Sequence, residues 1–183
     1  MLGVDPRHAS VILGRLTEGD HVFRLSHGRW AFPGRVSPFA VPEALTRPLP
    51  SYVSLQSALY HHGMIEQIPD VVYAVTLGPP RLALTPITAV SLHQVTPEFF
   101  FGFERLSNVG ANVATPEKAL LDFFYLRPAR SRRFRALPEL ELPRTFSKSR
   151  ARAMLTRIRS EPRRALVAEL LDHALSGRKQ RGA

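Results

Sequence analysis

The chain has 183 residues, of which 44% are hydrophobic and 22% charged, and these proportions are typical of a globular protein with a buried core. It contains no cysteine, which excludes disulfides, thiolate catalysis, iron–sulfur clusters and zinc sites built on cysteine. No apolar stretch is long enough to cross a bilayer, and the N-terminus lacks the apolar run of a secretory signal. We therefore expect a cytoplasmic protein that makes no contact with a membrane.

The charge is strongly positive and unevenly distributed. The chain carries 25 Lys and Arg against 15 Asp and Glu, a net charge of +10. Residues 127–159 alone contain 11 of the basic residues and only 2 of the acidic ones. Such a block favours a polyanion, DNA or RNA, as the partner, although an arginine-rich helix facing solvent has the same composition.

Residues 1–35 predict a helix followed at once by a short hairpin. Asp5 is a suitable helix cap, and Pro6 suits the first helical position. An apolar stripe follows at helical spacing and comprises Ala9, Ile12, Leu13 and Leu16. Residues 21–25 and 29–32 predict two strands, joined by a turn in which Gly28 supplies a positive φ.

A helix that runs directly into a tight basic hairpin is typical of the second half of a winged helix-turn-helix. In that motif the helix enters the major groove of DNA and the wing contacts phosphates. The groove-side residues are predicted to be Arg7, His8, Ser10 and Arg15. The wing residues are predicted to be Arg24, His27 and Arg29. The alternative is a helix and hairpin packed on the rest of the fold, with ordinary surface arginines.

The rest of the chain predicts a linker and an α+β domain. Residues 36–50 contain four prolines and are expected to form a linker with at most a short helix. Residues 51–183 are expected to form the C-terminal domain, with a mixed or antiparallel sheet and C-terminal helices. Its helices are predicted after the cap Ser54, from Pro116, and twice within 147–176. Its strands are predicted at 71–77, 87–95, 99–104 and 109–114.

No enzyme signature was found: the chain has no phosphate loop, no dinucleotide-binding glycine motif and no nucleophile elbow. Adjacent His61 and His62 point to different faces of a helix and do not jointly ligate a metal. Glu117, Lys118 and Asp122 weakly resemble the carboxylate–lysine set of restriction-type nucleases, but the pair Glu117–Lys118 opens a helix instead of ending a strand. We therefore expect no enzyme, no cofactor and no metal.

Two sequence blocks resemble those of a known family. The first is Ser-Leu-Gln-Ser-Ala-Leu-Tyr-His-His-Gly at 54–63, and the second is Ala-Thr-Pro-Glu-Lys-Ala-Leu-Leu-Asp at 114–122. Between them lies Phe-Phe-Gly-Phe-Glu at 100–104. In this order and spacing the blocks resemble the AbiEi family, the antitoxins of type IV toxin–antitoxin systems, which are related to predicted transcriptional regulators of viral defence.

The resemblance implies an N-terminal winged helix, represented here in part by residues 6–32, that binds inverted repeats in the promoter of its own operon and represses it. Because inverted repeats mirror a two-fold axis, a homodimer on the DNA is expected. It implies a C-terminal α/β domain that neutralises a nucleotidyltransferase-like toxin without a stable complex. Four arginines match no family motif and are expected to add phosphate contacts: Arg130, Arg132, Arg133 and Arg135. The alternative function is a protein- or RNA-binding module without operator-specific DNA binding.

Overall fold

The computed structural model describes residues 5–126 and 140–176. Its α-helices are α1 (Pro6–Glu18), α2 (Val41–Thr46), α3 (Leu55–His61), α4 (Pro116–Leu126), α5 (Lys148–Met154) and α6 (Glu161–Ser176). Its strands are β1 (Phe23–Ser26), β2 (Arg29–Ala31), β3 (Ser51–Val53), β4 (Val72–Thr76), β5 (Arg81–Leu84), β6 (Ala89–Gln94), β7 (Phe103–Leu106) and β8 (Ala111–Ala114). The fold is therefore mixed α and β.

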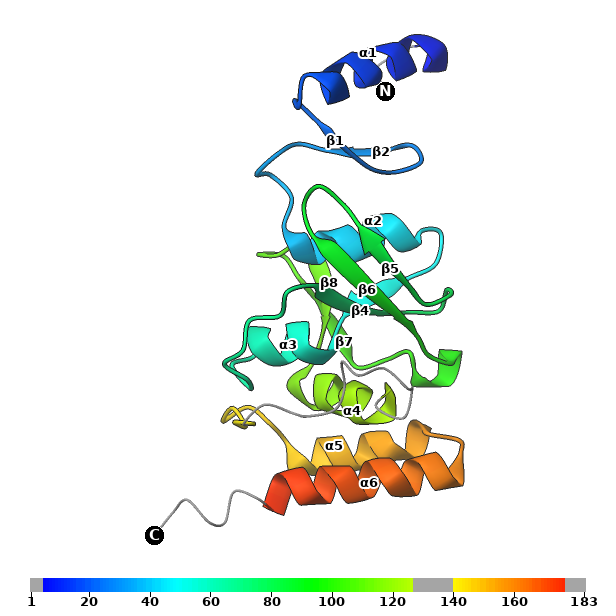
Figure 1. The fold of residues 1–183 in the computed structure, drawn as a ribbon. Coiled ribbons are helices and arrows are strands. Elements are labelled where there is room, and N and C mark those ends of the chain that lie inside the picture. Colours follow the sequence, from blue (N-terminus) through cyan, green and yellow to red (C-terminus); the bar gives the residue numbers. More distant parts are fainter. Residues whose placement is uncertain (1–4, 127–139, 177–183) are drawn as a thin grey trace.

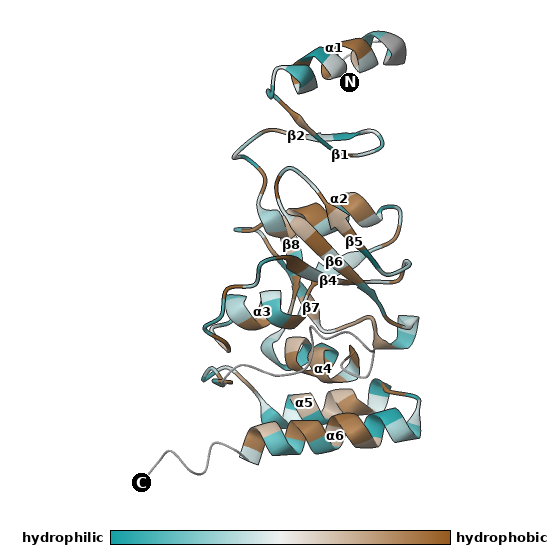
Figure 2. Cartoon of the chain, in the orientation of Figure 1, coloured by the Kyte–Doolittle hydropathy of each residue, from teal (hydrophilic) through white to brown (hydrophobic). Residues whose placement is uncertain are grey.

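The elements form successive layers along the long axis of the molecule (Figure 1). α1 and the β1–β2 hairpin lie at one end, and α5 with α6 lies at the other. Between them, α2 covers one face of the central sheet, and α3 and α4 cover the other face. Figure 2 shows apolar residues on α2, on the strands and on α4, where the layers meet. At the N-terminal end of the molecule, α1 thus lies farther from the central sheet than α2 does.

The central sheet has the strand order β5-β6-β4-β3-β8-β7. β4 pairs with β6 in parallel, with Val72 opposite Val90, and β3 pairs with β8 in parallel, with Val53 opposite Val113. The remaining pairs of this sheet are antiparallel. Of the two expected alternatives, a mixed or an antiparallel sheet, the structure has the mixed one. β1 and β2 form a separate two-stranded sheet.

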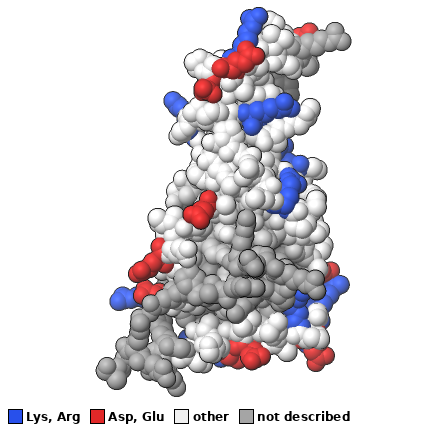
Figure 3. Space-filling model, in the orientation of Figure 1, with Lys and Arg blue, Asp and Glu red and all other residues white. Residues whose placement is uncertain are grey.

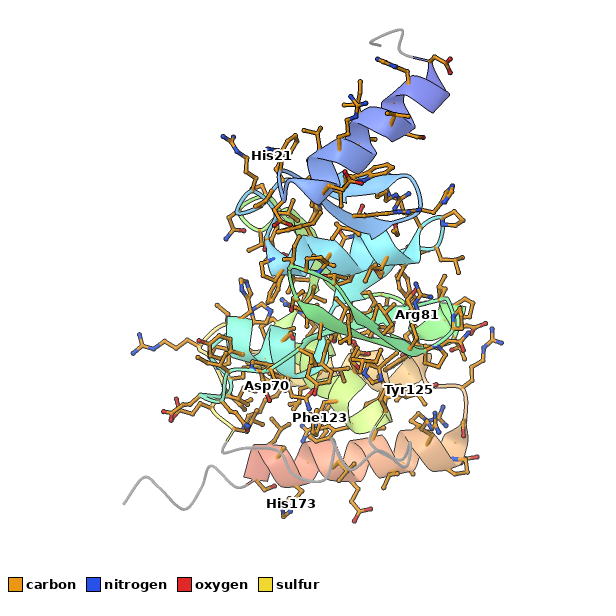
Figure 4. All side chains as sticks on the ribbon, turned by 45° about the horizontal axis from the view of Figure 1, so that its top comes forward. His21, Asp70, Arg81, Phe123, Tyr125 and His173 are labelled. Carbon is orange, nitrogen blue, oxygen red and sulfur yellow. The ribbon has the colours of Figure 1, made fainter. Side chains whose placement is uncertain are left out.

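α4 is the central helix of the core. Thr115 precedes it, and the backbone N–H of Lys118 donates to Thr115 Oγ1 over 3.4 Å, so the expected helix start is confirmed. Every residue from Glu117 to Leu126 is buried, because α4 lies between the sheet and the α5–α6 pair. Figure 4 shows Phe123 and Tyr125 of α4 in this position. A helix packed on all sides normally has few charges, and α4 is unusual in burying three.

The predicted helices from Pro6, from Pro116 and within 147–176 are confirmed. The predicted strand at 99–104 is wrong over residues 99–102, because Pro97–Phe99 forms a 3₁₀ turn and Gly102 has a φ of 75°. The strand β7 begins only at Phe103. Ser54 is the N-cap residue of α3, as predicted, but its side chain does not cap the helix, because its hydroxyl donates to Asp122 instead.

The predicted linker at 36–50 contains α2, whose Val41 belongs to the same hydrophobic core as the sheet. Pro42 lies in the first turn of α2, where the missing N–H of proline does not interrupt a helical hydrogen bond. The hairpin joins the body through Leu25, which is partly buried against the core, and through two side-chain hydrogen bonds to this helix. Ser26 Oγ and Arg29 Nη1 both donate to the carbonyl oxygen of Ala44, over 3.2 Å and 2.8 Å.

Candidate nucleic-acid interface

α1 begins and ends at local signals in the sequence. The N–H of Ala9 donates to the carbonyl of Asp5 over 2.9 Å, so the first helical turn closes on Asp5. At the other end, Asp20 has a φ of 54°, and the N–H of His21 donates to Leu16 O over 2.8 Å. This left-handed turn reverses the chain and leads it into β1. Figure 4 shows His21 at the junction.

The β1–β2 hairpin has two faces with different surroundings. Gly28 has a φ of 70° in the connecting turn, as the sequence predicts. Arg24 lies opposite Trp30 in the register, and the Arg24 guanidinium carbon is 6.0 Å from the centre of the Trp30 ring. Arg29, in contrast, donates its hydrogen bond to α2. One face of the hairpin therefore faces α1, and the other faces the body of the molecule.

A groove of about 490 Å³ separates α1 from the hairpin. Its lining residues are Ser10, Gly14, Thr17, Glu18, Arg24, His27, Gly28 and Trp30. We call this feature the interface groove. It brings together Ser10 from the predicted groove-side set with Arg24 and His27 from the predicted wing set. Arg24 and His27 are both exposed, and an exposed guanidinium next to an indole ring is suited to phosphate and base contacts.

The other predicted DNA-binding residues lie outside the interface groove. His8 and Arg15 are exposed on α1. Arg7 lies on α1 as well, but its side chain is outside the described part of the chain. Arg29 is half-buried against α2. The four arginines expected to add phosphate contacts, Arg130, Arg132, Arg133 and Arg135, lie outside the described residues.

The predicted apolar stripe of α1 is only partly covered. Ala9, Leu13 and Leu16 are half-buried, whereas Ile12 keeps 41% of its surface exposed. Val11 on the neighbouring face is 53% exposed. The end of the hairpin adds another apolar side chain, because Phe32 is 62% exposed. The surface of α1 and the hairpin is therefore both basic and apolar.

Sequence reasoning missed Trp30 as a residue of this surface. Its position could have been found from the hairpin register, since a residue directly across from Arg24 shares the same face of the two strands. Thr17 was missed too, and no sequence signal marks it, because its hydroxyl donates to Leu13 O within the helix.

A buried polar cluster lies in the body, away from this surface. Lys118 forms an ion pair with Asp122, and both side chains are fully buried. The other oxygen of Asp122 accepts from Ser54 Oγ over 2.7 Å and from the Tyr52 hydroxyl over 3.0 Å. The Lys118 Nζ atom lies 3.7 Å from the centre of the Phe99 ring. The Asp122 carboxylate thus has three hydrogen-bond donors, which a buried carboxylate needs.

Burial dominates the titration of this cluster. It raises the pKa of Asp122, although Lys118, Ser54 and Tyr52 oppose the shift by stabilising the carboxylate. It lowers the pKa of Lys118 against the attraction of Asp122. The pKa of the Tyr52 phenol is raised well above its ordinary value by burial and by the neighbouring Asp122 charge.

Glu117 is buried on the opposite side of the same helix start. Its Oε1 atom accepts from the backbone N–H of Ser147 over 2.7 Å, which joins α4 to the start of α5. Glu117, Lys118 and Asp122, the set that resembles a nuclease, therefore have no exposed surface with which to meet a substrate. Within residues 5–126 and 140–176, no three His, Asp or Glu side chains are grouped as metal ligands.

No protein-family model matches the chain, and no curated protein matches it in sequence. In the part of the chain that the structure describes, no helix is both long and apolar enough to span a membrane. The interface groove is the main candidate for a functional site in the described residues, because it gathers exposed cationic and polar side chains from two adjoining elements.

Proposed function

We propose that the chain binds double-stranded DNA through α1 and the β1–β2 hairpin, and that it is the autorepressor and antitoxin of a type IV toxin–antitoxin operon in phage defence. The observation that carries the DNA-binding part is the interface groove, which Ser10, Arg24 and His27 line together. A net charge of +10 supplies the long-range attraction for a polyanion.

The electrostatics of the interface groove indicate how a duplex would lie. Arg24 and His27 are on the hairpin side, whereas Glu18, at the end of α1, lines the other side. A phosphate near Glu18 would meet a like charge, so we place the DNA backbone along the hairpin. The N-terminal part of α1, on the face where Ser10 lines the groove, would then face the bases, as in helix–wing modules.

The antitoxin part of the proposal is supported by how the family-like blocks meet in the fold. Ser54 from the first block and Asp122 from the second are joined by a hydrogen bond of 2.7 Å, and Gly102 from the middle stretch packs against Lys118. The blocks thus describe one structural unit. We infer a nucleotidyltransferase-like toxin as its functional partner, no stable complex between the two, no enzymatic activity, a homodimer on the operator, and action in the cytoplasm.

The test is a mobility shift with the DNA upstream of the gene against a scrambled duplex of equal length, at two salt concentrations. Arg24→Gln is expected to weaken binding to both duplexes and to lower the slope of log K against log salt by about one, the value for one lost phosphate contact. Arg7→Gln is expected to change the preference between the duplexes. The matched control is Arg152→Gln, which removes an exposed arginine of α5.

Equal effects of Arg24→Gln and Arg152→Gln would mean that only net charge matters and would contradict an interface at the hairpin. Toxin neutralisation is tested separately, by co-expression with the nucleotidyltransferase-like gene of the same operon. Rescue of growth supports the antitoxin role, and its absence removes that part of the proposal while leaving DNA binding in place.

A second candidate function, a protein-binding module, is favoured by the exposed apolar side chains of Val11, Ile12 and Phe32. If the chain binds neither duplex, and if Ile12→Gln abolishes its capture of a protein partner, this second function replaces the first.

A further inference from the structure

Three arginines from different elements surround a hollow on the body side of the hairpin. Arg29 comes from β2, Arg47 follows the last residue of α2, and Arg105 comes from β7. The hollow measures about 250 Å³, and Ala40, Glu43, Ala44 and Gly110 complete its lining. We call it the arginine hollow. The sequence placed only Arg29 among the DNA-binding residues.

Glu43 lies between two of these arginines. Its Oε1 atom is 3.2 Å from Arg47 Nη2, and its Oε2 atom is 2.5 Å from Arg105 Nη1. Burial opposes the ionisation of Glu43, but the hydrogen bonds and charges of Arg105 and Arg47 outweigh it and hold its pKa below the ordinary value. The lining of the hollow contains one carboxylate and three guanidinium groups, which leaves an excess of two positive charges.

The arginines retain unused donors. A guanidinium has five N–H groups, and Arg29 uses Nη1 for its 2.8 Å bond to Ala44 O. The side chains of Arg47 and Arg105 are 59% and 55% exposed, so much of each guanidinium is open to solvent. Exposed ion pairs of this kind contribute little to stability. Exchanging part of the Glu43 contact for an anion therefore costs little.

The arginine hollow adjoins the interface groove. Gly28 lines the groove, and the next residue, Arg29, lines the hollow. The two sites therefore begin at neighbouring residues, on opposite faces of the hairpin. Figure 3 shows Lys and Arg side chains spaced along one edge of the molecule, from the level of the hairpin towards the far end. A duplex held at the hairpin turn would run past the hollow.

We propose that the arginine hollow binds a phosphate group of the DNA backbone, adjacent to the stretch held by α1 and the hairpin, and that Glu43 weakens this contact as a built-in competitor for the arginines. The inference rests on the proposed function and adds Arg47 and Arg105 to the interface. Planar guanidinium groups bind phosphate through paired N–H donors, which is the chemistry that the hollow offers.

The experiment is a fluorescence-anisotropy titration of the full chain with the upstream duplex over a range of salt. The double variant R47Q/R105Q is expected to raise the Kd several-fold and to lower the salt slope by about 0.9, because the one phosphate contact of the hollow is lost. The matched control is R152Q/R159Q, which removes two exposed arginines that are each paired with one carboxylate, Asp172 and Glu98, elsewhere on the molecule.

Glu43→Gln gives a result in the opposite direction. It is expected to lower the Kd, since Arg47 and Arg105 no longer share their N–H donors with a carboxylate and are free for the phosphate. A gain of affinity also cannot come from misfolding. A decrease in affinity, or no change, for Glu43→Gln would overturn the competitor role.

The outcomes separate this inference from the proposed function. If Arg24→Gln weakens binding but R47Q/R105Q behaves like R152Q/R159Q, the inference is overturned and the function survives. If the wild-type chain binds no duplex, both fail together. A calorimetric titration with inorganic phosphate is the last arm. Phosphate binding that is lost in R47Q/R105Q while DNA affinity is unchanged would assign the hollow to a free phosphate and overturn the DNA contact.

Discussion

Lys118 is the residue whose surroundings depart most from its usual preference. Lysine is almost never fully buried unless it is paired, and here the ammonium group has Asp122 as its partner. Its Nζ atom lies over the Phe99 ring, and Gly102 lies so close to the stem that a Cβ atom there would come within 3.0 Å of Lys118 Cγ. The absence of a side chain at Gly102 is therefore what makes room for the lysine.

Replacing Lys118 by methionine tests the energetic role of the pair. Lys118→Met keeps a long flexible side chain among the rings but leaves Asp122 as a buried carboxylate without its cation. We expect a loss of about 3–5 kcal/mol in the free energy of unfolding, the usual cost of breaking a buried pair from one side. Urea unfolding followed by circular dichroism measures it.

The control is the double variant K118M/D122N. The amide oxygen of the new side chain still accepts from Ser54 and Tyr52, and both charges of the pair are removed together. Most of the lost stability should return. A double variant as unstable as Lys118→Met would show that packing, and not the unpaired charge, is responsible.

At the scale of elements, α1 differs from α4 in how it is held. α4 is buried from Glu117 to Leu126, whereas α1 leaves Val11 and Ile12 exposed and packs only on the hairpin side. Elements with few buried apolar contacts open more easily than the core. We expect amides of residues 6–18 to exchange hydrogen much faster than those of α4, and bound upstream DNA to slow exchange in α1 alone. Mass spectrometry of peptides measures both.

Gly14→Ala provides the internal control for this difference. A Cβ atom at Gly14 meets nothing within 4 Å, and alanine is favoured over glycine in a helix by roughly 0.5–1 kcal/mol. The substitution should slow exchange in α1 and leave α4 unchanged. Exchange in wild-type α1 as slow as in α4, or no response to Gly14→Ala, would contradict a loosely held helix.

At the scale of the whole molecule, the features that could be predicted are those set by neighbours in sequence. Asp5 with Pro6 and Thr115 with Pro116 marked helix starts correctly, because capping depends on the next few residues. The hydroxyl of Ser54 was misread as a cap, since its partner Asp122 lies 68 residues away. The orientation of the Arg29 side chain likewise depends on a distant partner, the carbonyl oxygen of Ala44 in α2. Long-range partners leave no periodic signal in a single sequence.

The layered arrangement leads to a prediction about the whole chain. The cluster of buried hydrophobic residues extends from Val41 to Leu175 and includes none from α1 or the hairpin, although Leu25 of β1 is partly buried against it. Two hydrogen bonds to Ala44 O, from Ser26 and Arg29, fasten the hairpin, and water can replace them. We therefore expect residues 36–183 to fold without the N-terminal 35, with a single cooperative thermal transition.

A chain of residues 36–183 distinguishes DNA binding by α1 and the hairpin from DNA binding by net charge alone. Residues 1–35 carry five basic and three acidic residues, so their removal lowers the net charge only from +10 to +8. If charge alone binds DNA, affinity should scarcely change. If α1 and the hairpin form the interface, preference for the upstream duplex should be lost, leaving weak binding that disappears as salt increases. Retained preference for that duplex by the folded shortened chain would place the interface in the body.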